Sequence, residues 1–370
     1  MRVGRVPAIV GGAAGLAGLA GAAAVAGIVQ QRKRIASDRA LINPLSAAAL
    51  SGGRTDRQNR VTADDGVSLF TEQVGPLDAP LTVLFVHGYA LNLTSFILQR
   101  KAILDRFGDR VRLVFFDLRS HGRSDHAGAD SSTIEQLGAD LYQVIESVIP
   151  SGPIVLVGHS MGGMTVMALA AAHPELFGAA GRVRAVALVN TSSGELRTVT
   201  LGLPAAFARV TGPVLPRVVR RAGRNAALVE RGRALGKDLA WLLTKRLSFA
   251  DSDVPPAVVA FATNMIAATP VDVVADFFPT LMAHDGREGL SRLADTRVLI
   301  IGSDKDALTP LDHSRRLAEA LPNAQLEVAT NSGHLLMLEH PEVVNQALLE
   351  LIEQVYPPVS VAPRRTRRPA

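Results

Sequence analysis

The pentapeptide GHSMG (158–162) places a single serine where an apolar, strand-like run gives way to an apolar, helix-like run. Gly158 and Gly162 lie two residues either side of Ser160 and permit a turn too tight for side chains at their positions. A serine at such a junction can simply cap the helix that follows. It can also be a nucleophile, which requires an imidazole to accept its proton and a carboxylate to orient that imidazole.

Two later motifs contain those groups. His334 lies in NSGHLLMLEHPE, in a loop of small residues before the last helical stretch. Asp306 and Asp304 lie in LIIGSDKDALTP, just after an apolar run. We favour Asp306 as the orienting acid because of its spacing to the proline that closes the turn, although both acids could instead cap the next helix. The sequence therefore predicts Ser160 as nucleophile, Asp306 as orienting acid and His334 as base.

A further motif, VLFVHGYA, ends an earlier strand-like run. Gly88 leaves the backbone exposed there, and the N–H of Tyr89 could bind a developing oxyanion together with the N–H of Met161. Met161 begins a helix, where N–H groups lack partners and the helix dipole favours negative charge. For His87 we expect a hydrogen bond that fixes the turn rather than a part in the chemistry.

The elements needed to position these residues are strands that alternate with helices. Short continuous apolar runs predict strands buried on both faces of a parallel sheet. A hairpin is expected around Asp65-Gly66, and residues 132–149 have apolar side chains at helical spacing. The pattern predicts an α/β fold with a mostly parallel, doubly wound sheet, in which reactive groups collect at the carboxyl ends of the strands. The strand-like runs are LTVLFVHG, VRLVFFDLR, IVLVGHS, VRAVALVN and RVLIIGSD, with a weaker one at AQLEVAT.

One interval, residues 191–292, has helix-like segments and several prolines but no strand signal. An ordinary crossover is far shorter. We interpret this interval as a helical lid inserted into a sheet domain formed by residues 60–190 and 293–356. The alternative is a surface decoration with no part in the site.

The two ends of the chain differ from this body. Residues 6–29 carry no charge and are long enough to span a bilayer as a helix. We therefore interpret residues 1–34 as a membrane anchor or a cleaved export signal. The alternative is a disordered Gly/Ala-rich leader. The sequence does not decide on which side of the membrane the rest of the chain lies. Residues 35–59 are typical of a linker, and residues 357–370 of a disordered basic tail.

Charge and composition exclude several classes. Residues 1–60 carry nine Arg/Lys and two acids (+7) and residues 357–370 carry four arginines (+4), so the net charge of +5 leaves 5 − 7 − 4 = −6 for residues 61–356. A nucleic-acid-binding domain would carry a positive patch on its own surface, so no nucleic-acid partner is expected. The chain has no cysteine, which excludes thiol catalysis and Cys-ligated zinc.

With these residues in view, the chain resembles the α/β-hydrolase fold superfamily, in particular its lidded serine esterase and lipase-like members. The resemblance covers about residues 60–356 and rests on HGYA, DLRSHGRSD, GHSMGG, GSDKDALTP and SGHLLMLEHPE in the family's order. One departure is Ser120, where relatives often have glycine; it concerns loop geometry.

The resemblance implies hydrolysis of carboxylic esters through an acyl-enzyme on Ser160, with no metal and no organic cofactor. Because the lid is rich in apolar residues, we expect hydrophobic acyl or lipid-like esters. The same triad could serve an acyltransferase, a thioesterase, a C–C hydrolase or a perhydrolase. A tethered binding module without catalysis is a further alternative, which the intact set of three residues disfavours.

Overall fold

The structure is a computed structural model, and it describes residues 48, 50–198, 237–250 and 253–356. The expected anchor or signal segment (1–34), most of the linker (35–59), the tail (357–370) and residues 199–236 of the expected lid lie outside the described residues. No single helix in the described part is long and apolar enough to cross a membrane. One pair of helices, Pro256–Ala268 and Val271–Ala283, has that length and composition jointly, with a bend of 90° between the two.

An eight-stranded, mostly parallel sheet forms the centre of the molecule, with strand order β1-β2-β4-β3-β5-β6-β7-β8. The β1–β2 hairpin and the β2–β4 pair are antiparallel, and every other pair is parallel. This confirms the predicted fold class, including the hairpin, whose turn contains Gly66 at a φ of +89°. The strands are β1 (Arg57–Thr62), β2 (Ser68–Val74), β3 (Thr82–Val86), β4 (Arg112–Phe116), β5 (Ile154–His159), β6 (Val183–Val189), β7 (Arg297–Ser303) and β8 (Gln325–Ala329).

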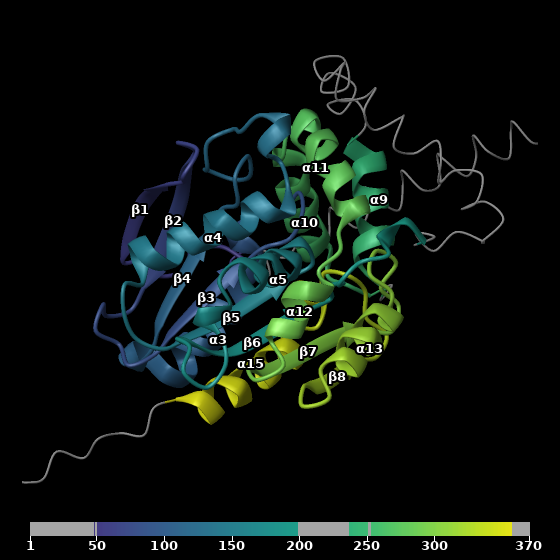
Figure 1. Cartoon of the computed structure of the whole chain (residues 1–370). Helices are drawn as coiled ribbons and strands as arrows, with labels where there is room; N and C mark the ends of the chain where they lie inside the picture. Colours follow the sequence, from purple (N-terminus) through teal and green to yellow (C-terminus); the bar gives the residue numbers. More distant parts are fainter. Residues whose placement is uncertain (1–47, 49, 199–236, 251–252, 357–370) are drawn as a thin grey trace, which may run out of the picture.

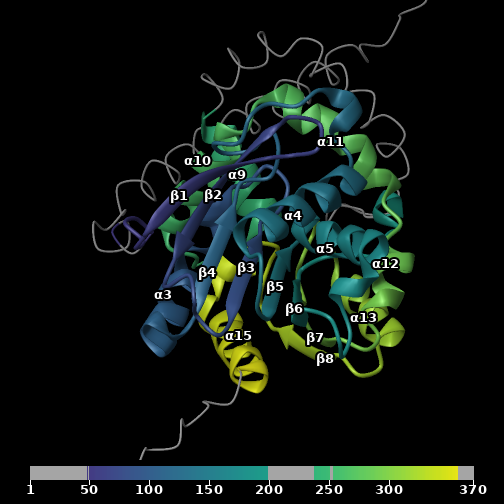
Figure 2. The same cartoon turned by 60° about the vertical axis from the view of Figure 1, so that its left-hand side comes forward.

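Helices cover both faces of the sheet (Figures 1 and 2). On one face, α3 (Ile97–Phe107) and α15 (Pro341–Val355) share a hydrophobic core with β3, β4 and β5. On the other face lie α4 (Ile134–Val148), α5 (Met161–Ala172), α12 (Arg287–Arg292) and α13 (Leu311–Ala320). Short helices also occur at α14 (Leu336–Glu339), η1 (Leu93–Phe96), η2 (Gly108–Arg110), η3 (Ala129–Ser131), η4 (Pro174–Leu176) and η5 (Leu196–Thr198).

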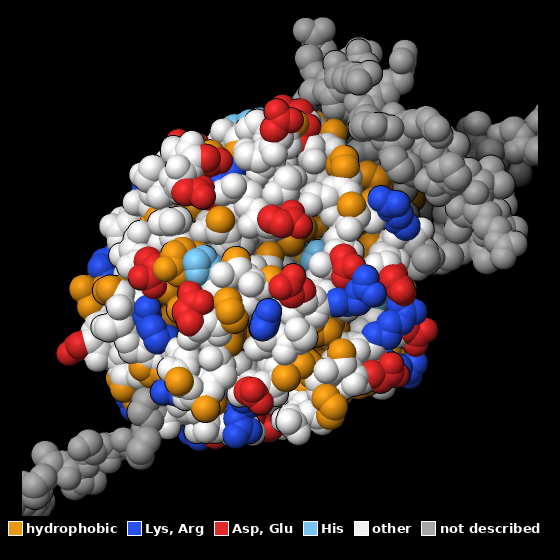
Figure 3. Space-filling view, viewed as in Figure 1, with side chains coloured by type: hydrophobic (Ala, Val, Ile, Leu, Met, Phe, Trp, Pro, Cys, Tyr) orange, Lys and Arg blue, Asp and Glu red, His pale blue; other side chains and the backbone are white. Residues whose placement is uncertain are grey.

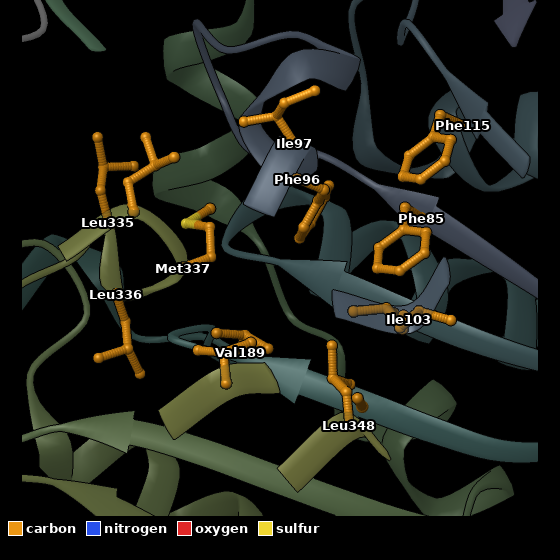
Figure 4. Close-up of a cluster of buried hydrophobic side chains, with 14 of the residues drawn as sticks. Phe85, Phe96, Ile97, Ile103, Phe115, Val189, Leu335, Leu336, Met337 and Leu348 are labelled. Carbon is orange, nitrogen blue, oxygen red and sulfur yellow. The ribbon is translucent and has the colours of Figure 1, made fainter. Parts of the chain in front are cut away.

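Alternate residues of the central strands belong to different cores, because successive side chains of a strand point to opposite faces. Phe85 of β3 lies in the core beneath α3, whereas its neighbours Leu84 and Val86 lie in the core beneath α4 and α5. The ring of Phe85 packs 4.7 Å from that of Phe115 and 5.0 Å from that of Phe96 between centroids (Figure 4). Burial on both faces is why these strands appear in the sequence as continuous apolar runs.

Between β6 and β7 the described chain forms helices, grouped at the upper right of Figure 1 apart from α12. They are α9 (Lys237–Ser248), α10 (Pro256–Ala268) and α11 (Val271–Ala283). Whether residues 191–292 act as a lid stays a prediction. The molecular surface seen in Figure 3 carries acidic and basic side chains interspersed with one another.

Candidate active site

The turn from β5 to α5 places Ser160 in a strained backbone conformation. Its φ of +53° and ψ of −119° are uncommon for a residue with a side chain. Both flanking glycines are required by contact: a Cβ on Gly162 would lie 2.0 Å from the carbonyl oxygen of Val86, and one on Gly158 would lie 2.7 Å from the carbonyl oxygen of Gly162. The turn therefore depends on glycine at both positions.

The structure brings Ser160, His334 and Asp306 together from the ends of three different strands. His334 Nε2 lies 2.9 Å from Ser160 Oγ, and His334 Nδ1 lies 2.8 Å from Asp306 Oδ2. All three residues are buried, with exposed fractions of 9%, 5% and 4% for the serine, histidine and aspartate. A carboxylate can only accept, so Nδ1 carries the imidazole proton and Nε2 is left to accept the serine hydroxyl.

Asp306 is itself held by its own turn. Its Oδ1 accepts the backbone N–H groups of Leu308 at 2.8 Å and Thr309 at 2.9 Å. Asp304, the other acid considered in the sequence, is exposed and accepts the N–H of Ser332 at 3.2 Å. The structure therefore places Asp306, and not Asp304, against the imidazole.

Sequence reasoning missed Thr309, whose hydroxyl lies at the centre of this contact. Its Oγ1 is 2.8 Å from Asp306 Oδ2, 2.9 Å from the carbonyl oxygen of Asn190 and 3.4 Å from His334 Nδ1. It has one proton to donate, so the hydroxyl supports either the carboxylate or the end of β6. Its position one residue before the closing proline was the available signal.

Three side chains hold the loop that carries His334. The carbonyl oxygen of His334 accepts from His159 Nε2 at 2.9 Å and from Asn190 Nδ2 at 3.1 Å. The N–H of Gly333 donates to Glu339 Oε2 at 2.6 Å. Burial lowers the pKa of His159 well below its ordinary value. The ring is therefore neutral, and its one N–H is the donor to this carbonyl oxygen. Asn190 ends a predicted strand, which is a signal that could have identified it.

The loop after β3 approaches the serine closely. A Cβ on Gly88 would lie 3.1 Å from Ser160 Cβ and 2.8 Å from His159 Nδ1, so only glycine fits there. Within the described ranges, neither the N–H of Tyr89 nor that of Met161 donates to another protein group. Two unpaired N–H groups thus lie on the elements that flank Ser160.

The peptide unit that carries the Tyr89 N–H is fixed from its other end by His87. The carbonyl oxygen of Gly88 belongs to the same planar unit, and it accepts from His87 Nδ1 at 2.8 Å. His87 Nε2 accepts the N–H of Leu118 at 2.9 Å, which ties this loop to the one after β4. Burial lowers the pKa of His87 well below its ordinary value, so the ring stays neutral and can accept.

The next peptide unit, which carries the N–H of Ala90, is held by His121 from the loop after β4. His121 Nε2 accepts the N–H of Ala90 at 3.2 Å, and its Nδ1 donates to the carbonyl oxygen of Arg119 at 2.8 Å. Burial lowers the pKa of His121 to about 4. Each loop therefore donates one backbone N–H to a neutral histidine of the other, with the two rings 5.5 Å apart.

Two buried ionic groups support the loop after β4. The guanidinium of Arg119 has no exposed surface and binds both oxygens of Asp140, each at 2.6 Å, and Asp65 at 2.7 Å. Asp117 accepts the N–H groups of Leu93 and Arg123, both at 2.8 Å, and burial raises its pKa to about 6. The sequence analysis named Asp65 in the hairpin and quoted Asp117 and Arg119 within DLRSHGRSD, but it gave none of these side chains a supporting role and did not identify Asp140.

Ser120, the residue that departs from the family pattern, has a φ of +64°. Glycine adopts this left-handed conformation without strain, which explains its frequency there in relatives. The Ser120 hydroxyl accepts the N–H of Ala127 at 2.9 Å, a contact that glycine lacks. In the described part of the chain, no group of three or more His, Asp or Glu side chains is arranged to hold a metal ion.

Comparisons with known proteins agree with the fold. The model of the alpha/beta hydrolase fold family matches residues 82–341. The solved structure of a thermophilic esterase from Thermogutta terrifontis is similar, with a TM-score of 0.64 and 26% identity, covering 82% of this chain and 100% of that chain. The protein named "Putative carbamate hydrolase RutD" from Caulobacter sp. (strain K31) is 27% identical over 278 residues, 75% of this chain and 92% of that protein. The sn-1-specific diacylglycerol lipase ABHD11 of Mus musculus is 26% identical over 278 residues, 72% of this chain and 79% of that protein.

Proposed function

Because this chain belongs to the alpha/beta hydrolase fold family, we propose that it is a serine hydrolase that cleaves carboxylic esters through an acyl-enzyme on Ser160. The observation that carries the proposal is the line of contacts from Asp306 Oδ2 to His334 Nδ1 and from His334 Nε2 to Ser160 Oγ, at 2.8 and 2.9 Å. A hydrogen-bonded alcohol, imidazole and carboxylate are the parts that nucleophilic acyl transfer needs.

In the first half of the reaction, Ser160 Oγ attacks the ester carbonyl carbon while its proton passes to His334 Nε2. The carbonyl electron pair moves onto oxygen and gives a tetrahedral oxyanion. The N–H groups of Tyr89 and Met161 donate to this oxyanion. When the intermediate collapses, the bond to the alcohol breaks and the departing oxygen takes the proton from His334, which leaves the acyl group on Ser160.

In the second half, water attacks the acyl carbon and gives one proton to His334 Nε2. The second tetrahedral intermediate collapses, the acid leaves, and Ser160 Oγ takes the proton back. Asp306 keeps its charge throughout and stabilises the transient imidazolium through Nδ1.

The electrostatic contribution comes mainly from fixed backbone groups. An N–H donor aimed at a developing oxyanion is worth about 3 kcal/mol, and the amino end of α5 adds a favourable dipole. These donors are already oriented by the strained turn at Ser160 and by the His87 contact to Gly88. Little reorganisation is then needed as charge develops.

For the substrate, we propose esters with a hydrophobic acyl group. Helices α10 and α11 are largely apolar, and the names of two similar proteins include esterase and lipase. A carbamate is the second candidate, because a similar protein covered over 92% of its length carries that name. Acyl transfer to an acceptor other than water uses the same acyl-enzyme and remains an alternative outcome.

The test is a substrate panel on the full-length protein and its Ser160→Ala variant. The panel contains 4-nitrophenyl acetate, butyrate and octanoate, together with a 4-nitrophenyl carbamate. We expect Ser160-dependent turnover that is faster for butyrate and octanoate than for acetate. Equal rates along the series would refute the acyl preference. Preferred turnover of the carbamate would favour the second candidate, and activity retained in Ser160→Ala would refute the proposal.

A further inference from the structure

The side chain of Tyr89 reaches out of the loop after β3 and contacts helix α11. Its hydroxyl donates a hydrogen bond to the backbone carbonyl oxygen of Val274. Its ring is half-buried against the core beneath α4 and α5. Burial, with a further contribution from the negative charge of Asp276, raises the pKa of the phenol, so the hydroxyl keeps its proton and remains a donor.

The carbonyl oxygen of Val274, in the first turn of helix α11, accepts this bond. Pro279 lies further along the helix and has no N–H, so the carbonyl that loses its helical partner is that of Ala275, next to Val274. A carbonyl oxygen has two lone pairs, so Val274 can accept the phenol even where it also accepts a helical N–H.

The same helix contacts the neighbouring loop. The ring of Phe277, which is fully buried, packs edge-to-face with that of His121, with 5.4 Å between the ring centroids. His121 in turn accepts the N–H of Ala90. One turn further along, the hydroxyl of Thr280 accepts the N–H of Ile134 at 3.2 Å, which ties α11 to the start of α4.

Gly88 has no Cβ to limit the rotation of the peptide unit that carries the Tyr89 N–H. Contacts within the loop act on only one end of this peptide unit, because His87 Nδ1 and the N–H of Leu91 both donate to the carbonyl oxygen of Gly88. Ala90 has a φ of +56°, a strained value for a residue with a side chain. Contacts from outside the loop add to these, and those from α11 reach it directly through Tyr89 and indirectly through His121.

We propose that Tyr89 is a positioning residue whose hydroxyl ties helix α11 to the oxyanion-binding loop and so holds the Tyr89 N–H toward Ser160. This inference rests on the proposed function and deepens it. The backbone of residue 89 supplies the donor, and its side chain fixes the direction in which the donor points. Helix α11 then contributes to the chemical step.

The test is Tyr89→Phe in the full-length protein, with Tyr142→Phe as the matched control. Tyr142 lies on α4 and stacks on His173 at 3.6 Å, away from the loop. Tyr89→Phe removes one oxygen atom and leaves the backbone donor in place. We expect kcat for 4-nitrophenyl butyrate to fall about 3- to 10-fold, the range for one lost buried hydrogen bond, with KM unchanged. The control is expected to keep wild-type values.

A second readout separates positioning from a general loss of stability. Ser160 adds to the carbonyl of an alkyl trifluoromethyl ketone and gives a tetrahedral adduct whose oxygen is an oxyanion. The matching methyl ketone binds without forming this adduct. Tyr89→Phe should lower the affinity for the trifluoromethyl ketone by the same factor as kcat. The affinity for the methyl ketone should not change. If kcat and the affinity for the trifluoromethyl ketone both stay within about 2-fold of wild type, the inference is overturned. It is also overturned if Tyr89→Phe weakens the binding of both ketones equally. Either result would leave the proposed function untouched. Absence of any Ser160-dependent turnover in the wild type would refute the proposed function as well.

Discussion

Replacing Asp306 by asparagine tests how the carboxylate orients the imidazole. Two backbone N–H groups, of Leu308 and Thr309, point at Oδ1 at 2.8 and 2.9 Å. The asparagine oxygen must occupy that position, because turning the amide would leave both donors unpaired at about 1–3 kcal/mol each. The amide NH2 then lies where Oδ2 was, 2.8 Å from His334 Nδ1.

An NH2 group at that place donates, so Nδ1 of His334 must accept and the ring proton moves to Nε2. The imidazole can then no longer accept the proton of Ser160. For a serine hydrolase in which the wrong tautomer is imposed in this way, the rate falls about 10⁴-fold, which corresponds to about 5.4 kcal/mol. The fold should be little affected, since volume and the two backbone contacts are kept.

The assay is kcat/KM for 4-nitrophenyl butyrate at pH 7.5, with Asp304→Asn as the control. Asp304 is exposed and accepts only the N–H of Ser332 among the described residues, a bond that asparagine can also accept. We expect Asp304→Asn to retain at least about a third of the activity. The tautomer argument is refuted if Asp306→Asn keeps more than about a tenth of the wild-type rate, or if both variants lose activity equally.

Two further predictions concern the elements that hold the site. Gly162→Ala should lower the free energy of unfolding by about 1–3 kcal/mol or more and abolish turnover, because the new Cβ would lie 2.0 Å from a backbone oxygen of β3. The control is Gly128→Ala, where a new Cβ would meet no atom within 4 Å. This control should leave the urea denaturation curve unchanged. Burial holds the pKa of His121 at about 4 in the fold, so its stabilising contribution is complete above pH 6.5 and falls as the pH drops toward 4. Between pH 7.5 and 5 the wild type should therefore lose about 2 kcal/mol more than His121→Asn, while the opposite contribution of Asp117, whose pKa is raised to about 6, is common to both. An identical pH dependence in the two proteins would contradict the neutral, buried state of His121.

The fold could be predicted from the sequence because strands buried on both faces leave continuous apolar runs. The family comparison and the sheet confirm that prediction. The residues around Ser160 could be located because glycine spacing and strand ends are local features. Their proposed roles rest on chemistry that the kinetic tests above address.

The contacts that the supporting residues make could not be predicted, because the partners are distant in the sequence, even where a strand end or a proline marked the residue itself. Asn190 reaches the carbonyl oxygen of residue 334, and His121 reaches the N–H of Ala90. A tyrosine after the HG pair carries no local sign that its hydroxyl will meet helix α11. Such contacts are set by how loops from different strands converge, and a single sequence does not encode that convergence in any local pattern.

The most direct test of the central claim is to map a fluorophosphonate adduct by mass spectrometry on the intact, full-length protein. The account predicts one adduct, on the peptide that contains Ser160, and none in Ser160→Ala. His334→Ala should slow labelling by several orders of magnitude. An adduct on another residue, or labelling of His334→Ala at the wild-type rate, would contradict the account.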